Sequence, residues 1–263
     1  MRSVDLITSR IIAAPHAFTS RIGGVSLAPF DSLNTSFAVR DDPANVHHNL
    51  QTIGRTFGFS PAQLMTLEQV HGDEIVHVTK ILRSEAADGA PPKGDALVSD
   101  NAHVFIGVRT ADCIPLLIEG AEHDLVAAVH AGWRGVMNEI AAKTVFALVQ
   151  LGARACDLRM AVGPCIRSCC YEVDIALASQ FASAFGNDVV KATVDGEKPH
   201  LDLVHALLVS LARSGVERSN IDVVDICTSC DSRFFSHRRD RGHTGRQLAL
   251  ISPRRRSNSI AVA

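Results

Sequence analysis

Residues 110–135, TADCIPLLIEGAEHDLVAAVHAGWRG, carry chemically reactive side chains at both ends of one short segment. Cys113 stands near the start, and His130 stands near the end, shortly before Trp133, the only tryptophan of the chain. A thiolate and an imidazole can bind one metal ion together, or they can form a catalytic pair in which the imidazole activates the sulfur. Both chemistries require the two side chains to meet in space.

The sequence between the two residues predicts how they meet. The apolar runs IPLLI and LVAAV flank the polar hexapeptide EGAEHD, a pattern typical of two antiparallel strands joined by a loop. We expect Ile118 to pair with Leu125. That register puts Cys113 directly opposite His130, with Cβ atoms about 5 Å apart on one face. Pro115 is unusual inside a strand, and a bulge there would shift the register by one residue.

A third ligand is needed for the commonest kind of catalytic zinc site, in which water takes the remaining position. His71 is the candidate, because it ends the predicted strand LMTLEQV. The intervals of 42 residues from His71 to Cys113, and 17 from there to His130, match no local finger or ribbon pattern. Spacing alone therefore leaves two interpretations open: a three-ligand metal site, and a buried cysteine with two structural histidines.

The elements that must position these residues alternate along the chain without an internal repeat. Apolar residues at helical spacing, with helix-terminating signals, predict helices at 42–57, 136–152 and 201–215. Short apolar runs predict strands at AFTS, LMTLEQV, EIVHVTK, HVFIGVRT, LRMAV, IDVVDI and RQLALIS, besides the hairpin. This order predicts an α+β domain with helices packed outside one or two sheets.

The composition is that of one globular domain over residues 1–263, with a loose tail from about residue 253. Hydrophobic residues make up 46% of the chain, and the net charge of −2 favours neither nucleic acid nor a membrane surface as a partner. No apolar run approaches the roughly 20 residues of a membrane helix, and signal-peptide features are lacking, so we expect a cytoplasmic protein. Seven cysteines, two of them adjacent, do not suggest a disulfide framework.

Six motifs carry a resemblance to a known family. They are, in chain order, QVHGDEIVHV, GDALVSD, RTADCIPLLI, AAVHAGWRGV, VGPCIRSCCYEV and FFSHRRDRGHTGR. Together they resemble the laccase-domain family of purine nucleoside phosphorylases, also called polyphenol oxidase or peptidoglycan editing factor, from about residue 16 to 251. The resemblance implies a four-layer α–β–β–α sandwich of mixed sheets. It also implies a metal, usually zinc with copper possible, on His71, Cys113 and His130.

The activity that the resemblance implies is phosphorolysis of adenosine, inosine, guanosine and methylthioadenosine, with hydrolytic deamination of adenosine. The partners are then a small purine nucleoside and phosphate, and a monomer and a homodimer both stay open. Deamination needs a hydroxide, which a metal supplies by lowering the pKa of bound water toward about 7. Phosphate is best bound by guanidinium groups. Four arginines are candidates for substrate binding: Arg134, Arg238 and Arg246 inside these motifs, and Arg21 in FTSRIGGVS, which resembles the N-terminal signature of the family.

Two other enzyme classes remain as alternatives. Cys113 could be the nucleophile of a metal-free hydrolase that edits peptidoglycan precursors, with His130 or His71 as its base. A copper-dependent polyphenol oxidase is the second alternative. A multicopper enzyme would need many more histidines, typically in His-x-His pairs, and the chain has no His-x-His pair.

Several other residues in or near the motifs also have side chains that could do chemistry. Trp133 is expected to anchor the hairpin to a helix rather than to stack on a purine. Asp112 should point away from Cys113 and have a structural role. The CTSC segment, Cys227 to Cys230, lacks a second cysteine pair nearby, so it is not expected to bind metal. Cys165, Cys169 and Cys170 stay unassigned.

Overall fold

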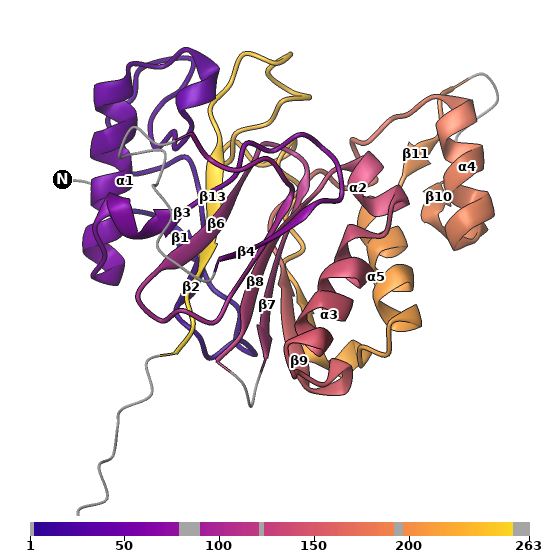
Figure 1. The fold of residues 1–263 in the computed structure, drawn as a ribbon. Helices are drawn as coiled ribbons and strands as arrows, with labels where there is room; N and C mark the ends of the chain where they lie inside the picture. The colour runs from indigo at the N-terminus through magenta and orange to yellow at the C-terminus, as the bar shows by residue number, and fades with distance from the viewer. Residues whose placement is uncertain (1–2, 79–89, 121–123, 192–196, 255–263) are drawn as a thin grey trace, which may run out of the picture.

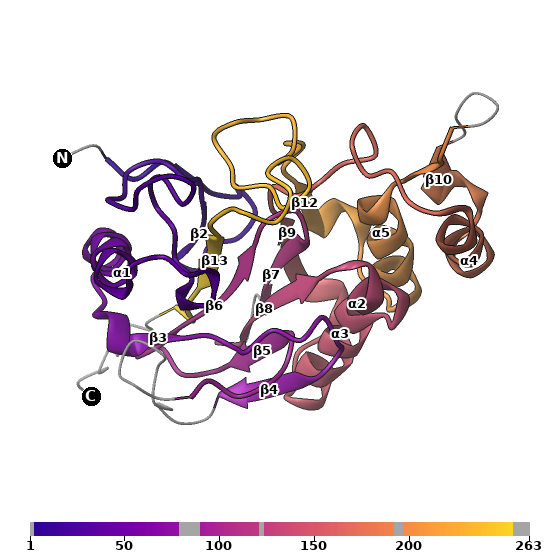
Figure 2. The same ribbon diagram turned by 90° about the horizontal axis from the view of Figure 1, so that it is seen from above.

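In a computed structural model, the chain folds into two β-sheets that pack face to face, with helices on both outer sides (Figure 1). The structure describes residues 3–78, 90–120, 124–191 and 197–254. The four layers, from α1 through both sheets to α3 and α5, are visible from above (Figure 2). They confirm the α–β–β–α sandwich. In the described part of the chain, no helix is long and apolar enough to cross a membrane.

The first sheet has the strand order β1-β2-β13-β6-β3. Its strands are β1 (Leu6–Ile7), β2 (His16–Thr19), β3 (Leu64–Met65), β6 (Phe105–Thr110) and β13 (Gln247–Ile251). Helix α1 (Pro43–Phe57) covers its outer face. Asp42 accepts the backbone N–H of Ala44, and Gly58 ends the helix at a φ of 73°, so both ends follow the capping signals in the sequence.

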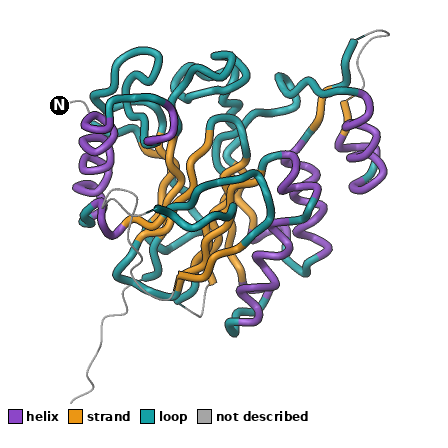
Figure 3. The backbone as a smooth tube through the Cα atoms, turned by 45° about the horizontal axis from the view of Figure 1, so that its top comes forward, coloured by secondary structure: helices purple, strands orange, loops and turns teal. Residues whose placement is uncertain are grey.

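The second sheet has the order β12-β9-β7-β8-β5-β4. Its strands are β4 (Ile75–Val78), β5 (Ala96–Ser99), β7 (Ile114–Gly120), β8 (Val126–Ala131), β9 (Leu158–Val162) and β12 (Ile221–Val223). Helices α2 (Trp133–Met137), α3 (Ile140–Gln150) and α5 (Leu203–Arg213) lie on its outer side, as the tube view also shows (Figure 3). Helix α4 (Ile175–Phe185) lies beyond α5 with the strand pair β10 (Val190–Lys191) and β11 (His200–Leu201).

Successive side chains along a strand alternate between two hydrophobic clusters, one on each face of the sheet. In β13, Leu248 and Leu250 pack in the cluster under α1, whereas Ala249 and Ile251 pack in the cluster between the sheets. In β7, Leu117 joins that middle cluster, and its neighbours along the strand face the helices of the other side. Because successive side chains of a strand point to opposite faces, strands buried on both sides are apolar throughout.

Helices predicted at 42–57 and 201–215 are confirmed as α1 and α5. The single helix predicted at 136–152 is wrong: α2 and α3 are separate, and Glu139 between them has a φ of 56°, which no α-helix accommodates. The long strand predicted at LMTLEQV is also wrong, since β3 ends at Met65 and is followed only by an isolated bridge between Glu68 and Lys93. Helix α4 was not predicted. Most of the tail predicted from about residue 253 lies outside the described residues, which end at residue 254.

The predicted hairpin exists, but its register is shifted by two residues. Ile118 pairs with Ala127 rather than Leu125, and Pro115, not Cys113, lies opposite His130. Cys113 immediately precedes β7. An even-numbered shift keeps the same side chains on the same face of the sheet, so Cys113 stays on the side of His130.

Candidate metal centre

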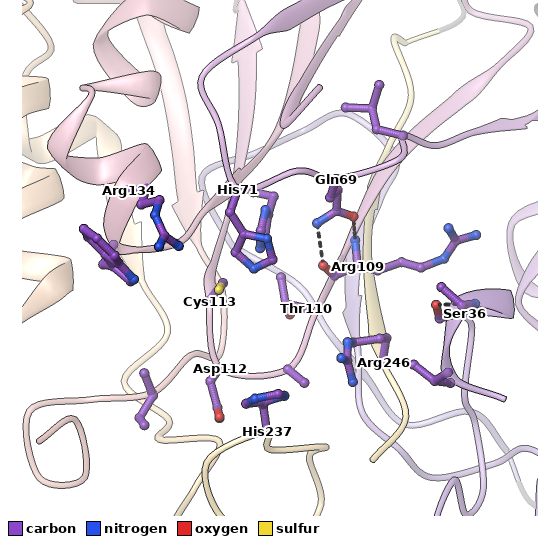
Figure 4. A pocket seen from close by; sticks show the side chains of 18 of the residues that line it. Ser36, Gln69, His71, Arg109, Thr110, Asp112, Cys113, Arg134, His237 and Arg246 are labelled. Atoms are coloured by element: carbon purple, nitrogen blue, oxygen red, sulfur yellow. Dashed lines mark hydrogen bonds between the residues drawn. The ribbon is translucent and has the colours of Figure 1, made fainter. Parts of the chain in front are cut away.

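His71, Cys113 and His130 converge at one end of the second sheet. Their ligand atoms, one per residue, all lie within 4.8 Å of one another. His71 comes from the loop between β3 and β4, Cys113 from the turn before β7, and His130 from the end of β8. The two imidazole rings meet edge to face, with centroids 4.8 Å apart. The structure therefore brings together the three residues that the resemblance implied. Figure 4 labels two of them, His71 and Cys113, at the cavity beside them.

Asp95, directly before β5, orients His130. The Asp95 carboxylate is fully buried, and its Oδ1 lies 2.7 Å from His130 Nδ1. The backbone N–H of His130 also donates to the carbonyl of Asp95 at 2.8 Å. With Nδ1 engaged by a carboxylate, Nε2 is the nitrogen that remains for a metal, the usual arrangement around metal-binding histidines.

The same carboxylate shapes the loop that carries His71. It accepts the backbone N–H groups of Val70 at 3.2 Å, His71 at 3.0 Å and Gly72 at 2.6 Å. His71 has a φ of 58°, uncommon for a residue other than glycine. Burial raises the pKa of Asp95, but the bonds from His130 and from these N–H groups lower it below the ordinary value. Asp95 thus holds two of the three converging residues.

Gln69 fixes the loop from its other side. Its amide oxygen accepts the backbone N–H of Arg109 at 2.8 Å, and its amide nitrogen donates to the Arg109 carbonyl at 2.8 Å (Figure 4). This pair of bonds ties the loop to β6 of the first sheet. Asp95 and Gln69 were not predicted from the sequence as residues of this centre. The available signal was their place inside two of the family motifs, GDALVSD and QVHGDEIVHV.

Charges in the centre are strongly coupled. Burial raises the pKa of Cys113, but the positive His130 and the hydrogen bonds from both imidazoles lower it, to about 6. Burial lowers the pKa of His130, but the charges of Cys113 and Asp95 raise it, to about 9. At neutral pH the metal-free centre is therefore a thiolate beside an imidazolium. Metal binding requires the imidazole to lose that proton.

We predict that iodoacetamide modifies Cys113 in the metal-free protein with a rate that rises through about pH 6, and not near the ordinary thiol pKa of 9.0. The thiolate is the nucleophile, and a lowered pKa makes it available at lower pH. Mass spectrometry of the modified peptide at a series of pH values measures this. A midpoint near pH 9 would contradict the ion pair.

The donor set fits a soft or borderline metal ion, because one thiolate and two imidazoles are a ligand combination that zinc and copper accept. Gly132 gives the donors room. A Cβ built on Gly132 would lie 3.2 Å from Cys113 Sγ and 3.2 Å from His71 Cδ2. The glycine therefore keeps the space beside both ligands open.

Replacing Gly132 by alanine should weaken metal binding, by about 10-fold for a ligand displacement that costs about 1.4 kcal/mol. Gly72→Ala is a matched control, since a Cβ there makes only ordinary contacts at 3.5 and 3.6 Å. Zinc affinity is measured by competition with a chromophoric chelator. Equal affinities of the two variants would contradict crowding at the ligands.

A cavity of about 690 Å³ opens beside the three ligands. This volume lies in the range of about 300–1,000 Å³ usual for small-molecule sites. Its lining includes an apolar and aromatic part and two carboxylates, Glu68 and Asp112. The described lining also contains four arginines: Arg109, Arg134, Arg238 and Arg246. The excess of guanidinium groups favours an anionic ligand.

Three of the four arginines predicted from sequence line this cavity. Arg134 stacks over Trp133 at 4.3 Å, and Arg238 lies 5.3 Å from the centre of the Tyr171 ring. Arg246 is held by the carbonyls of Thr244 and Gly245, each at 2.9 Å. Burial lowers the pKa of Arg246, while Cys113 and Asp112 raise it.

Arg21 is placed differently. It does not belong to the cavity lining, and it pairs with Asp31 at 2.9 Å while stacking over Phe235 at 4.7 Å. These contacts favour a role in shaping the neighbouring loop. Its assignment to substrate binding stays a prediction without geometric support.

Trp133 and Asp112 also belong to the cavity wall. Trp133 opens α2 and packs against the core under the second sheet, as expected of an anchor, yet it also faces the cavity. The Asp112 carboxylate accepts the Thr228 hydroxyl at 2.6 Å and the backbone N–H of Arg238 at 2.6 Å. Its role is therefore to hold the loops that follow β12, in line with the structural role predicted for it.

Similarity to known proteins extends over nearly the whole chain. A purine nucleoside phosphorylase of Deinococcus radiodurans is 38% identical over 263 residues, covering 99% of this chain and 97% of that protein. Purine nucleoside phosphorylase YlmD of Geobacillus stearothermophilus is 37% identical over 253 residues, covering 90% and 89%.

Solved structures agree with these relatives. The crystal structure of YlmD from Geobacillus stearothermophilus matches with a TM-score of 0.89 at 35% identity, over 97% of both chains. That of the Bacillus licheniformis hypothetical protein YfiH also matches with a TM-score of 0.89, at 32% identity over 96% of this chain and 97% of the other. A family model described as multi-copper polyphenol oxidoreductase laccase matches residues 15–254. The chain therefore belongs to this laccase-like family, whose relatives include proteins named purine nucleoside phosphorylase.

Proposed function

We propose that the protein is a zinc-dependent purine nucleoside phosphorylase that also deaminates adenosine. The observation that carries the proposal is the position of the cysteine–histidine cluster at the wall of a cavity rich in arginine. The names of the relatives support the phosphorylase part. The expected substrates are adenosine, inosine, guanosine and methylthioadenosine.

His71, Cys113 and His130 would hold the metal. When bound, zinc supplies Lewis-acid polarisation and lowers the pKa of a water ligand, as deamination requires. Asp95 keeps His130 in the orientation that leaves Nε2 for the metal.

Phosphorolysis breaks the bond between the sugar C1′ and the purine nitrogen, and a phosphate oxygen forms the new bond at C1′. The proton of the phosphate has to reach the departing base. We assign the phosphate to Arg246, Arg238 and Arg134, because their guanidinium groups line the cavity. Trp133 and Tyr171 offer aromatic surfaces for the base. Burial and the charge of Cys113 raise the pKa of Tyr171 to about 12, so its hydroxyl stays protonated and can donate a hydrogen bond.

A metal-free cysteine hydrolase is the second candidate, because the pKa of Cys113, about 6, gives a thiolate at neutral pH. The copper oxidase is less well supported. The two ligand groups found among the described residues are this cluster and a set of four cysteines, and neither offers the many histidines of a multicopper centre. Adventitious copper at His71, Cys113 and His130 remains compatible with the family model's description.

The test is chromatography of adenosine incubated with the zinc-loaded protein, with and without phosphate. We expect adenine and ribose 1-phosphate only when phosphate is present, and inosine with ammonia in either case. No turnover of adenosine, inosine or guanosine would overturn the proposal. Activity that survives chelation and disappears on alkylation would favour the cysteine hydrolase.

Arg246→Gln should raise the KM for phosphate by about 10-fold or more, since a charge-assisted contact contributes about 1.5–3 kcal/mol. Arg21→Gln is the matched control, because Arg21 lies outside the cavity lining, and its KM for phosphate should change little. Initial rates at varied phosphate and saturating adenosine measure both. An equal rise in the two variants would contradict the assignment of phosphate to Arg246.

A further inference from the structure

Four cysteines converge at a second place, away from the first cluster. The sulfurs of Cys169, Cys170, Cys227 and Cys230 all lie within 4.8 Å of one another. Cys230 Sγ lies 3.3 Å from Cys170 Sγ and 3.6 Å from Cys169 Sγ. All four are free thiols. The sequence did not predict this arrangement, because more than fifty residues separate the SCCY segment from the CTSC segment.

The spacing is that of a tetrathiolate metal site. Zinc–sulfur bonds of about 2.3 Å in a tetrahedron give sulfur–sulfur edges of about 3.8 Å. The distances from Cys230 Sγ, 3.3 Å to Cys170 Sγ and 3.6 Å to Cys169 Sγ, lie just below this edge, and no pair of the four sulfurs is more than 4.8 Å apart. A single disulfide would use two of the sulfurs and would leave the convergence of the other two without a purpose.

The backbone holds the two cysteine pairs in place independently of any metal. The Cys230 N–H donates to the Cys227 carbonyl at 3.2 Å, which closes the tight turn of a Cys-x-x-Cys segment. The backbones of Cys165 and Cys227 form an isolated parallel β-bridge, in which the N–H of Cys165 lies 3.3 Å from the carbonyl oxygen of Ile226. The N–H of Arg167 donates to Cys227 Sγ at 3.5 Å, a type of bond that stabilises metal-bound thiolates.

We propose that Cys169, Cys170, Cys227 and Cys230 bind a structural zinc ion that fixes one wall of the cavity. Tetrahedral sulfur sites with four ligands leave no position for water and are structural rather than catalytic. The carbonyl of Cys170 accepts Arg238 Nη1 at 3.1 Å.

The wall beside this site belongs to the catalytic cavity. Tyr171, the next residue after Cys170, lines the cavity together with Arg238. Thr228, inside the CTSC segment, donates to Asp112 next to the first cluster. The second zinc would therefore clamp the segment 167–171 to the segment 227–231, and through them position Tyr171 and Arg238.

The test counts metal in the full-length protein after removal of loosely bound zinc. Elemental analysis should give two zinc ions per chain for the wild type and one for Cys113→Ala. It should also give one for Cys169→Ser/Cys230→Ser. Cys156→Ser is the matched control, because Cys156 belongs to neither cluster, and it should keep both ions.

A second measurement does not depend on variants of the new site. Cobalt(II) loaded into Cys113→Ala should show intense thiolate-to-metal charge transfer and the visible bands of a tetrahedral tetrathiolate. No metal in Cys113→Ala, or a Cys170–Cys230 disulfide found by thiol titration of protein purified without oxygen, would overturn the proposal. Neither readout uses nucleoside turnover, so this inference and the proposed function can fail separately.

Discussion

Cys113→Ser is expected to lower kcat/KM for adenosine phosphorolysis by about 10³-fold or more, which corresponds to about 4 kcal/mol of lost transition-state stabilisation. The substitution changes little in volume. A serine hydroxyl does not ionise in the range where the Cys113 thiol does, at about pH 6, so the centre loses its anionic soft ligand. His130 loses the charge that contributes to raising its pKa to about 9, so its protonation changes as well.

The measurement compares zinc content and steady-state rates of Cys113→Ser with those of wild type and of Cys156→Ser. Cys156 belongs to neither ligand cluster, so its variant controls for the loss of a thiol as such. We expect the Cys113 variant to lose one zinc ion and the activity together. A variant that keeps the full zinc content but has no activity would indicate that Cys113 acts as a nucleophile. Unchanged activity would contradict both roles.

Local patterns predicted the elements that carry the centre, but not the contacts between them. The hairpin followed from two apolar runs around a polar loop, and its face was right although its register was wrong by two residues. The register depends on Pro115 and on β9, because the N–H of Gly163, directly after that strand, donates to the Pro115 carbonyl at 2.9 Å. Such a partner from a distant segment leaves no periodic signal in the hairpin itself.

Residues that act through others were the least predictable. Asp95 directly precedes β5, and its role depends on β5 pairing with β8 so that Ala96 lies opposite Val129. Gln69 lies in a segment that resembled a strand, yet it is a loop residue that binds the backbone of β6. Both functions arise only when segments far apart in the sequence are brought together.

Asp95→Asn is the variant that tests this positioning without removing a ligand. An asparagine keeps the shape but replaces one acceptor oxygen by a donor group. In the wild type, four N–H groups point at the two carboxylate oxygens of Asp95. They come from the backbone of Val70, His71 and Gly72 and from the ring of His130. At least one of them would then face another donor inside a buried site, which costs about 1–3 kcal/mol of the free energy of unfolding.

The zinc affinity of the first centre should fall by about 10–100-fold in Asp95→Asn, the usual effect of losing a carboxylate behind a metal-binding histidine. Chelator competition measures the affinity, and urea unfolding of the metal-free protein measures the stability. Asp100→Asn is the control, because the Asp100 side chain is 59% exposed and lies near His77 rather than near the centre. Loss of stability with unchanged zinc affinity would show that Asp95 supports only the loop.

The pH dependence of the free energy of unfolding should differ between the wild type, which has the Asp95 carboxylate, and Asp95→Asn, which has an amide. The pKa of Asp95 is lower in the folded protein than its ordinary value of 3.8, so its ionisation stabilises the fold above that value. This contribution is lost as the pH falls through the folded pKa, because the wild-type carboxylate then becomes protonated. The difference in the free energy of unfolding between wild type and Asp95→Asn should therefore be largest near neutral pH and shrink below about pH 4. A difference that stays constant down to that pH would mean that the negative charge of Asp95 does not hold the His71 loop, and that hydrogen-bond geometry alone does.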